Sequence, residues 1–374
     1  MEVLIAGDFC PQERVAVKFR ERNFSDVLGY VKEKISKVDY SIVNYECPII
    51  CGGEKAIKKC GPNLKCSRDG LDALKWAGFD AVTLANNHFY DFGDKGVVNT
   101  VKACSEIGID YVGGGRNITE ASDILYKCIN DEVLSVINCC EHEFSIATEF
   151  TGGSNPLNPI KQFYEIQEAS KKSDYVVVIV HGGNEYYQLP SPRMKELYRF
   201  FIDCGADCVI NHHQHCFSGY EVYKEKPIFY GLGNFCFDDH TYTAKSWFEG
   251  YMVDVFFHNK SVKFQLIPYT QCHITPQILL KEGKERKLFD SEIDKLNKII
   301  DDDRRLYEEY EFYLDEKKDS IRTLFLPIAN KLTIKLCRRH LLPNFVSKNN
   351  KYNILNFLMC ESHLPKFIKY IKDL

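Results

Sequence analysis

The chain has 374 residues, enough for one large domain or for two. Its 45% hydrophobic and 27% charged residues are typical of a globular protein, and its formal net charge of -4 gives no reason to expect a nucleic acid partner. The sixteen cysteines lack the paired CxxC spacing of a structural zinc site, and MEVLIAGDFC lacks the basic start of a signal peptide. No segment approaches the roughly 18 uncharged residues of a membrane span. We therefore expect a cytoplasmic protein with reduced thiols and no transmembrane segment.

Short apolar runs of strand length recur before residue 240. They are EVLIAG (2–7), SIVNYE (41–46), AVTLAN (81–86), LSVINC (134–139), YVVVIV (175–180), CVINHH (208–213) and IFYGLGNF (228–235). Segments with helical spacing separate several of these runs. In the last of them Ser191 is a candidate N-cap, Pro192 stands at the first helical position, and Gly205 closes the helix. Strands that alternate with helices predict an α/β domain with largely parallel pairing.

The pattern changes after Gly250, where residues 251–269 read as two alternating strands joined by a tight turn. This hairpin makes the predicted sheet mixed. Beyond Pro276 the chain becomes charged and helical, so we expect an α/β domain over 1–275 and a helical C-terminal extension over 276–374.

The end of the predicted extension interleaves basic residues with Leu, Ile and Phe. The basic residues considered are Lys335, Arg338, Arg339 and Lys348. The favoured interpretation is a helical cap with a solvated charged face. A peripheral contact with an anionic membrane or with a partner is the alternative.

Polar side chains stand at the ends of six predicted strands. They are Asp8, Asn44 and Glu46, residues 86–88 with Asp91, residues 181–185, residues 212–215, and Asn234. In α/β sheets ligands gather at the carboxyl ends of the strands, so we expect these side chains on one rim. Each alone has a structural alternative: Asp8 could cap a helix, Asn87 could occupy a turn, and His181 could be a core histidine. The coincidence at six strand ends favours a metal site.

The ligand types indicate which metals would bind. Carboxylates, an amide oxygen and imidazoles without thiolate suit Mn, Fe or Zn. There are more candidate ligands than one ion needs, which favours two divalent ions about 3.5–4 Å apart and bridged by a carboxylate. His212 and His213 are adjacent on an extended segment and should point opposite ways, so which of them is the inner ligand stays open.

Six sequence blocks occur in one order over roughly residues 2–240. They are Gly7-Asp8, Asn44-x-Glu46, LANNHxxDxG (84–93), HGGNEY (181–186), CGAD (204–207) leading into the histidine cluster, and FYGLGNFCFD (229–238). Together they resemble the bacterial capsule synthesis protein family of the CapA type, which is related to the calcineurin-like metallophosphatases. The resemblance implies a four-layer α/β/β/α sandwich with mixed sheets and two metal ions at the carboxyl ends of its strands.

The resemblance also implies a role for each matching residue. Asp8 would bind one ion, Glu46 would bridge the two, and Asn87 would bind the second. The other expected ligands are His181, His213 and His215. His88 would be the acid or charge stabiliser beside the substrate, and the catalytic set also includes Asp91 and Glu185. Additional candidate ligands are Cys10, Asn44, His212 and Asn234, where Cys10 occupies the position of a metallophosphatase histidine.

Two functions of different classes follow. The first is metal-dependent hydrolysis of a phosphoester or related bond, with His88 assisting the leaving group. The resemblance places this chemistry in the synthesis of a capsule, a surface polysaccharide or poly-γ-glutamate. The alternative is a non-catalytic factor that binds a polymer or assembles a synthase. The expected partners are an anionic polymer, a sugar or a phosphoester, and the polymer-synthesis machinery.

Overall fold

The computed structural model describes residues 1–239, 241–323, 325–326, 328–343, 345–346, 350–351, 354–355, 358, 368 and 370–371. Lys348 of the basic segment lies outside these residues. The chain forms two compact units, Met1–Leu306 and Tyr307–Leu374. Among the described residues, no helix is both long enough and apolar enough to cross a bilayer.

The first sheet contains eight strands of the described chain, in the order β16-β15-β14-β1-β2-β3-β4, with β13 paired to β1. Their bounds are β1 (Glu2–Cys10), β2 (Tyr40–Tyr45), β3 (Ala81–Thr83), β4 (Asp110–Val112), β13 (Asn234–Phe237), β14 (Glu249–His258), β15 (Ser261–Gln271) and β16 (Ile278–Leu280). Strands β1 to β4 are parallel, whereas β14 and β15 form the predicted hairpin. Asn259 and Lys260 in its turn both have positive φ, as a type I′ turn requires.

The second sheet has the order β11-β12-β10-β9-β7-β6 and is also mixed. Its strands are β6 (Leu125–Ile129), β7 (Glu132–Cys140), β9 (Tyr175–His181), β10 (Cys208–His212), β11 (Tyr220–Tyr223) and β12 (Lys226–Phe229). A small ribbon pairs β5 (Gly114–Gly115) with β8 (Gly153–Ser154). The prediction of one strand over residues 228–235 is therefore wrong. These residues contribute to two strands, β12 in the second sheet and β13 in the first. Gly233, with φ +78°, lies where the chain crosses between them.

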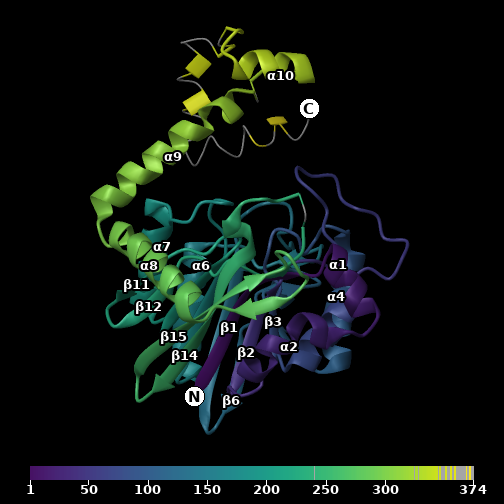
Figure 1. Ribbon diagram of the computed structural model, residues 1–374, viewed down its shortest axis with the longest axis vertical. Coiled ribbons are helices and arrows are strands. Elements are labelled where there is room, and N and C mark those ends of the chain that lie inside the picture. Colours follow the sequence, from purple (N-terminus) through teal and green to yellow (C-terminus); the bar gives the residue numbers. More distant parts are fainter. Residues whose placement is uncertain are drawn as a thin grey trace. The chain divides into compact units, whose positions relative to one another are not determined.

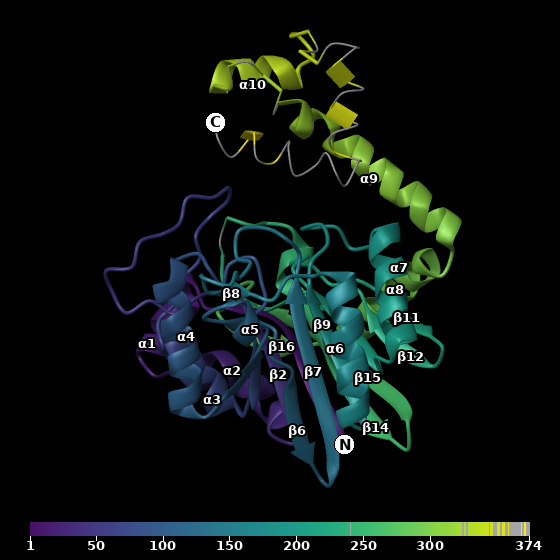
Figure 2. The same cartoon turned by 180° about the vertical axis from the view of Figure 1, so that it is seen from behind.

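The two sheets pack face to face, and helices cover their outer sides (Figures 1 and 2). The helices beside the first sheet are α1 (Glu13–Arg20), α2 (Phe24–Ile35), α3 (Asp69–Ala77) and α4 (Gly93–Ile107). Those beside the second are α6 (Pro159–Lys172) and α7 (Pro192–Cys204), and the latter has the predicted Ser191 cap and Gly205 terminus. Short helical turns occur at α5 (Ile118–Ala121) and η1 (Lys245–Phe248). The predicted α/β/β/α sandwich is confirmed.

Alternation along β1 shows why the layers form. Val3 and Ile5 point into the core between the sheets, whereas Leu4 and Ala6 point into the core beneath α1–α4. Successive side chains of a strand face opposite sides, so a strand buried on both faces must be apolar throughout. The short apolar run 2–7 is therefore a central strand.

Helix α8 (Gly283–Ile300) packs against β11 within the first unit. Its Phe289 ring lies 5.2 Å from the Phe217 ring and 5.7 Å from the Tyr251 ring, measured between centroids. The first unit thus continues past the predicted boundary at residue 275, because this apolar face covers the sheet edge. Helix α9 (Asp303–Thr323) begins in the first unit, and α10 (Lys331–Arg338) lies in the second.

Candidate metal centre

The carboxyl ends of four strands bring five candidate ligands together. Asp8 lies near the end of β1, and Glu46 directly follows β2. His181 is the last residue of β9, and His213 and His215 follow β10. All five side chains are buried, none more than 5% exposed. Strands of both sheets therefore contribute to one buried cluster.

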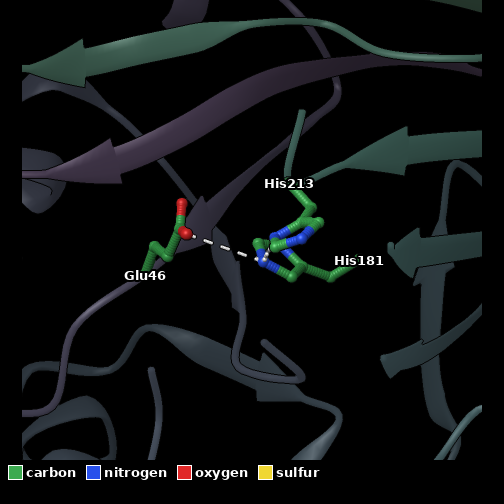
Figure 3. Close-up of side chains that lie close together, drawn as sticks. All are labelled: Glu46, His181 and His213. Atoms are coloured by element: carbon green, nitrogen blue, oxygen red, sulfur yellow. Dashed lines mark hydrogen bonds and ion pairs between the residues drawn. The ribbon is translucent and has the colours of Figure 1, made fainter. Parts of the chain in front are cut away.

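Two groups of ligand atoms share the Glu46 carboxylate. The first contains Asp8, Glu46 and His215, and the second contains Glu46, His181 and His213. Glu46 Oε1 lies 3.6 Å from His181 Nε2 and 3.6 Å from His215 Nε2. Figure 3 shows this carboxylate facing the rings of His181 and His213. Two candidate ligand groups therefore meet at one shared carboxylate.

The turn after β10 decides which histidines enter the cluster. His213 has φ +92° and His215 has φ +53°, both in the left-handed region that non-glycine residues rarely adopt. Such strained backbone is typical of functional sites. His212 remains in the strand, where its Nδ1 lies 3.7 Å from Asp8 Oδ1, but it belongs to neither group. Of the two histidines that the sequence left open, His213 therefore belongs to a candidate ligand group and His212 does not.

Asp8 is held by a close approach of two backbone segments. Its N–H donates to the Gly233 carbonyl over 3.2 Å. A Cβ on the preceding Gly7 would lie only 1.9 Å from that carbonyl oxygen, so no other residue fits there without a shift of the chain. This close approach explains why a glycine precedes Asp8 in the sequence.

Two of the additional candidates support ligands. Asn44 Nδ2 donates a hydrogen bond to Asp8 Oδ1 over 2.7 Å. The Thr83 hydroxyl in turn donates to Asn44 Oδ1, which fixes the orientation of this amide. Asn234 Oδ1 lies 2.9 Å from His215 Nδ1, which leaves Nε2 of that ring to face Glu46. Metal-binding histidines commonly have such a partner on their second nitrogen. Cys10 belongs to neither group and lies in the core, where its Sγ accepts a hydrogen bond from Gln12.

Asn87 extends the second group. Its Oδ1 lies 3.1 Å from His181 Nε2, and its Nδ2 donates to Glu143 Oε2 over 3.2 Å. Glu143 follows β7 and was not among the residues predicted from the sequence. The signal was present, because residues 141–143 follow the apolar run 134–139 just as the other ligands follow their strands.

His88 and Asp91 form a buried pair at the edge of the cluster. His88 Nδ1 lies 2.7 Å from Asp91 Oδ2, and Asp91 also accepts from the Leu64 N–H. Lys59 forms an ion pair with Asp91, and its Nζ lies 3.1 Å from His88 Nδ1. The Lys59 side chain is only 2% exposed. Its contribution was not predicted, because the loop between β2 and α3 carries no regular pattern.

Glu185 occupies an exposed position in the loop after β9. Burial is the main cause of the raised pKa of Glu46, and the nearby Glu185 adds a smaller contribution. The neighbouring Tyr186 ring lies 6.2 Å from the His215 ring, and its hydroxyl forms a hydrogen bond with the Tyr242 hydroxyl. The loop therefore brings an aromatic side chain next to one candidate ligand, His215.

Burial dominates the electrostatics of the cluster. It raises the pKa of Glu46 well above its ordinary range, with a further contribution from Asp8, and raises the pKa of Asp8 as well. Burial lowers the pKa of His213 to about 3 and lowers the pKa of His181. These imidazoles are therefore neutral at pH 7 and offer lone pairs, which is the form that binds metals.

A divalent cation fits the donor set. Both Glu46 carboxylate oxygens are buried, and neither has a hydrogen-bond partner among the described residues. A buried carboxylate without a donor is strongly destabilising unless a cation compensates it. The oxygen and imidazole nitrogen atoms around it suit Mn, Fe or Zn.

Fold and site together define an α/β/β/α protein with a candidate dinuclear centre at its strand ends. The model of the bacterial capsule synthesis protein PGA_cap matches residues 2–239, and the chain belongs to this family. A capsule biosynthesis protein CapA of Bacillus anthracis is 36% identical over 220 residues, 57% of this chain and 54% of the relative. The match thus spans about half of that relative. The PGA biosynthesis protein CapA of Bacillus subtilis is 29% identical over 77% of this chain and 76% of its own.

Two solved structures have some likeness to this chain. A phosphatase from Mycoplasma pneumoniae has 17% identity and a TM-score of 0.44, over 77% of this chain and 96% of its own. A 5′-nucleotidase precursor from Thermus thermophilus has 13% identity and a TM-score of 0.41, over 78% of this chain and 57% of its own.

Proposed function

We propose that this protein is a two-metal-dependent hydrolase of the phosphoesterase type that acts in the synthesis of a capsule, a surface polysaccharide or poly-γ-glutamate. One observation carries the proposal: the buried Glu46 carboxylate lies between two ligand groups and has no hydrogen-bond partner for either oxygen among the described residues. The names of the family and of the two CapA relatives support the biosynthetic setting.

Each group would hold one ion. Asp8, Glu46 and His215 would bind the first, and Glu46, His181, His213 and Asn87 the second. When bound, such an ion pair supplies charge that lowers the pKa of water and stabilises the oxygens of a phosphoryl group during in-line displacement. The two candidate ligand groups at the strand ends support this assignment.

His88 would assist the leaving group. Its Nδ1 lies against Asp91 and Lys59, so the ring orientation is set from the buried side and Nε2 remains for a proton transfer. Asp91 would act through His88 by holding the ring. The exposed Glu185 would contact the substrate, for which we expect a sugar or phosphoester or an anionic polymer.

The test begins with metal analysis and continues with a substrate screen. The protein purified without chelator should contain about two transition-metal ions per chain, and it should hydrolyse at least one phosphoester from a panel of sugar phosphates and diesters. His88→Asn should retain the ions and lose the hydrolysis. A protein that binds no ion even when Mn²⁺ or Zn²⁺ is supplied would contradict the proposal.

A second candidate function is a non-catalytic factor that binds the polymer or assembles its synthase. It is favoured by the name of a Mycobacterium tuberculosis relative, "Probable polyglutamine synthesis accessory protein", which is 26% identical over 58% of this chain. Two bound ions without hydrolysis across the panel, together with retention on immobilised poly-γ-glutamate, would favour this function.

A further inference from the structure

We propose that Glu143 is a positioning residue that orients two ligands of the second ion, Asn87 and His213, and thereby sets the affinity of that ion alone. The inference deepens the proposed two-ion centre and rests on it. The observation is that one loop carboxylate contacts both side chains, through different oxygens.

The contact with Asn87 decides which amide atom faces the cluster. An ionised carboxylate only accepts hydrogen bonds, so the Asn87 atom 3.2 Å from Glu143 Oε2 must be the NH₂ group. Oδ1 then points to the opposite side, 3.1 Å from His181 Nε2. If the amide turned over, its NH₂ group would face the position of the cation. Glu143 therefore selects the ligating orientation.

The position of Glu143 beside His213 similarly favours one ring nitrogen as the ligating atom. Glu143 Oε1 lies 3.8 Å from His213 Nε2, and His213 Nδ1 lies 3.1 Å from His181 Nε2. The 3.8 Å separation is too long for a hydrogen bond, so the carboxylate acts on the ring through its negative charge, which favours a proton on the near nitrogen, Nε2, and leaves Nδ1 free for a metal. Glu143 thus favours Nδ1 of His213 as the ligating atom.

The loop that carries Glu143 also contacts the backbone of Asn87, one of the two ligands. The buried Ser145 hydroxyl donates to the Asn87 carbonyl over 2.5 Å and accepts from the Tyr90 N–H over 3.3 Å. Glu143 itself is 41% exposed. A replacement there should leave the core and the first ligand group in place, so that its effect is confined to the second ion.

The experiment is calorimetric titration of the metal-depleted full chain with Mn²⁺, for the parent, Glu143→Ala and Glu143→Gln. For the parent we expect two ions. For Glu143→Ala we expect the first ion at parental affinity and the second weakened by about 10–100-fold. Glutamine keeps an oxygen that can accept from Asn87, so Glu143→Gln should lie between the two. Glu149→Ala, which removes an exposed carboxylate of the same loop, is the matched control and should bind as the parent does.

Three outcomes would overturn the inference. If Glu143→Ala binds both ions with parental affinity, the carboxylate does not act on the ligands. If it weakens both ions equally, or if Glu149→Ala has the same effect, the carboxylate acts through overall charge and not through Asn87 and His213. In these cases the two-ion centre survives, whereas a parent that binds no metal would remove the proposed function itself.

Discussion

The two halves of the candidate centre are supported in different ways. Asp8 and His215 are held by the buried amides of Asn44 and Asn234, which lie on strands of the first sheet. Asn87 and His213 are instead contacted by Glu143, a half-exposed carboxylate on a loop. The shared Glu46 links these halves.

Two ligand groups that share one carboxylate therefore need not bind their ions equally well. Ligands fixed by buried strands lose little freedom when a cation binds, whereas ligands oriented by a loop depend on that loop being in place. We therefore expect the Asp8 half to fill at lower metal concentration than the Asn87 half.

Replacement of the shared carboxylate should have the largest effect. Glu46→Gln removes the charge common to both groups, so the gain in unfolding temperature on adding Mn²⁺ should be lost. The metal-free variant should be more stable than the metal-free parent, by about 1–3 kcal/mol, because it lacks a buried carboxyl without hydrogen-bond partners whose raised pKa disfavours folding at neutral pH. Thermal and urea unfolding with and without Mn²⁺ measure both effects.

Glu221→Gln is the matched control, since Glu221 is also buried but is paired with Arg199 over 2.6 Å. It should lower the stability of the metal-free protein and keep the gain on metal binding. A metal-free Glu46→Gln variant less stable than the parent would show that Glu46 is compensated by the protein alone.

Removal of one histidine should affect one half. We expect His213→Ala and His215→Ala each to bind one ion in place of two, because each ring belongs to a single group. The ion left in His213→Ala should bind more tightly than the ion left in His215→Ala, since the Asp8 half has buried support. Elemental analysis and Mn²⁺ titration give the stoichiometry and the affinities. Equal affinities in the two variants would remove the proposed asymmetry.

The smallest effect concerns the pH dependence of stability without metal. Burial lowers the pKa of His213 to about 3, below its value of about 6.5 in the unfolded chain. The unfolded state therefore binds more protons, and this ring destabilises the folded protein progressively as pH falls below about 6.5. At pH 5 its contribution is a loss of about 2 kcal/mol. Asp8 and Glu46, whose pKa values are raised, contribute with the opposite sign.

His213→Gln should therefore reduce the change in unfolding free energy between pH 7 and pH 5 by about 2 kcal/mol relative to the metal-free parent. His215→Gln should reduce it less, because the Asp8 charge and the Asn234 hydrogen bond oppose the lowering of the His215 pKa. Urea unfolding at both pH values, in the presence of chelator, makes the comparison. An equal reduction in the two variants would contradict this difference between the halves.

Much of the centre could be predicted from the sequence, because the polarity of a strand end is a local property. Asp8, Glu46 and His181 each end an apolar run, and parallel strands bring their carboxyl ends to one edge. The alternation of strands and helices likewise predicted an α/β domain, since each strand carries its own burial pattern, whereas the four layers were implied by the family resemblance.

Other features depended on chain segments distant in sequence. Lys59 and Glu143 lie on loops, and nothing in their own neighbourhoods shows that one contacts Asp91 and the other Asn87. The run 228–235 looked like one strand because its residues are apolar, and only the crossing at Gly233 shows that it serves two sheets.

Whether His212 or His213 joins a ligand group also depended on the tertiary structure. Both rings follow the apolar run, and their spacing alone treats them alike. The positive φ of His213 turns its ring toward His181 and Glu46, a conformation that the surrounding chain must stabilise against its strain. The sequence by itself thus determined which side chains stand at the strand ends, because that order is local. Only the tertiary structure decided which of them meet, because contacts between distant segments and a strained turn set their directions.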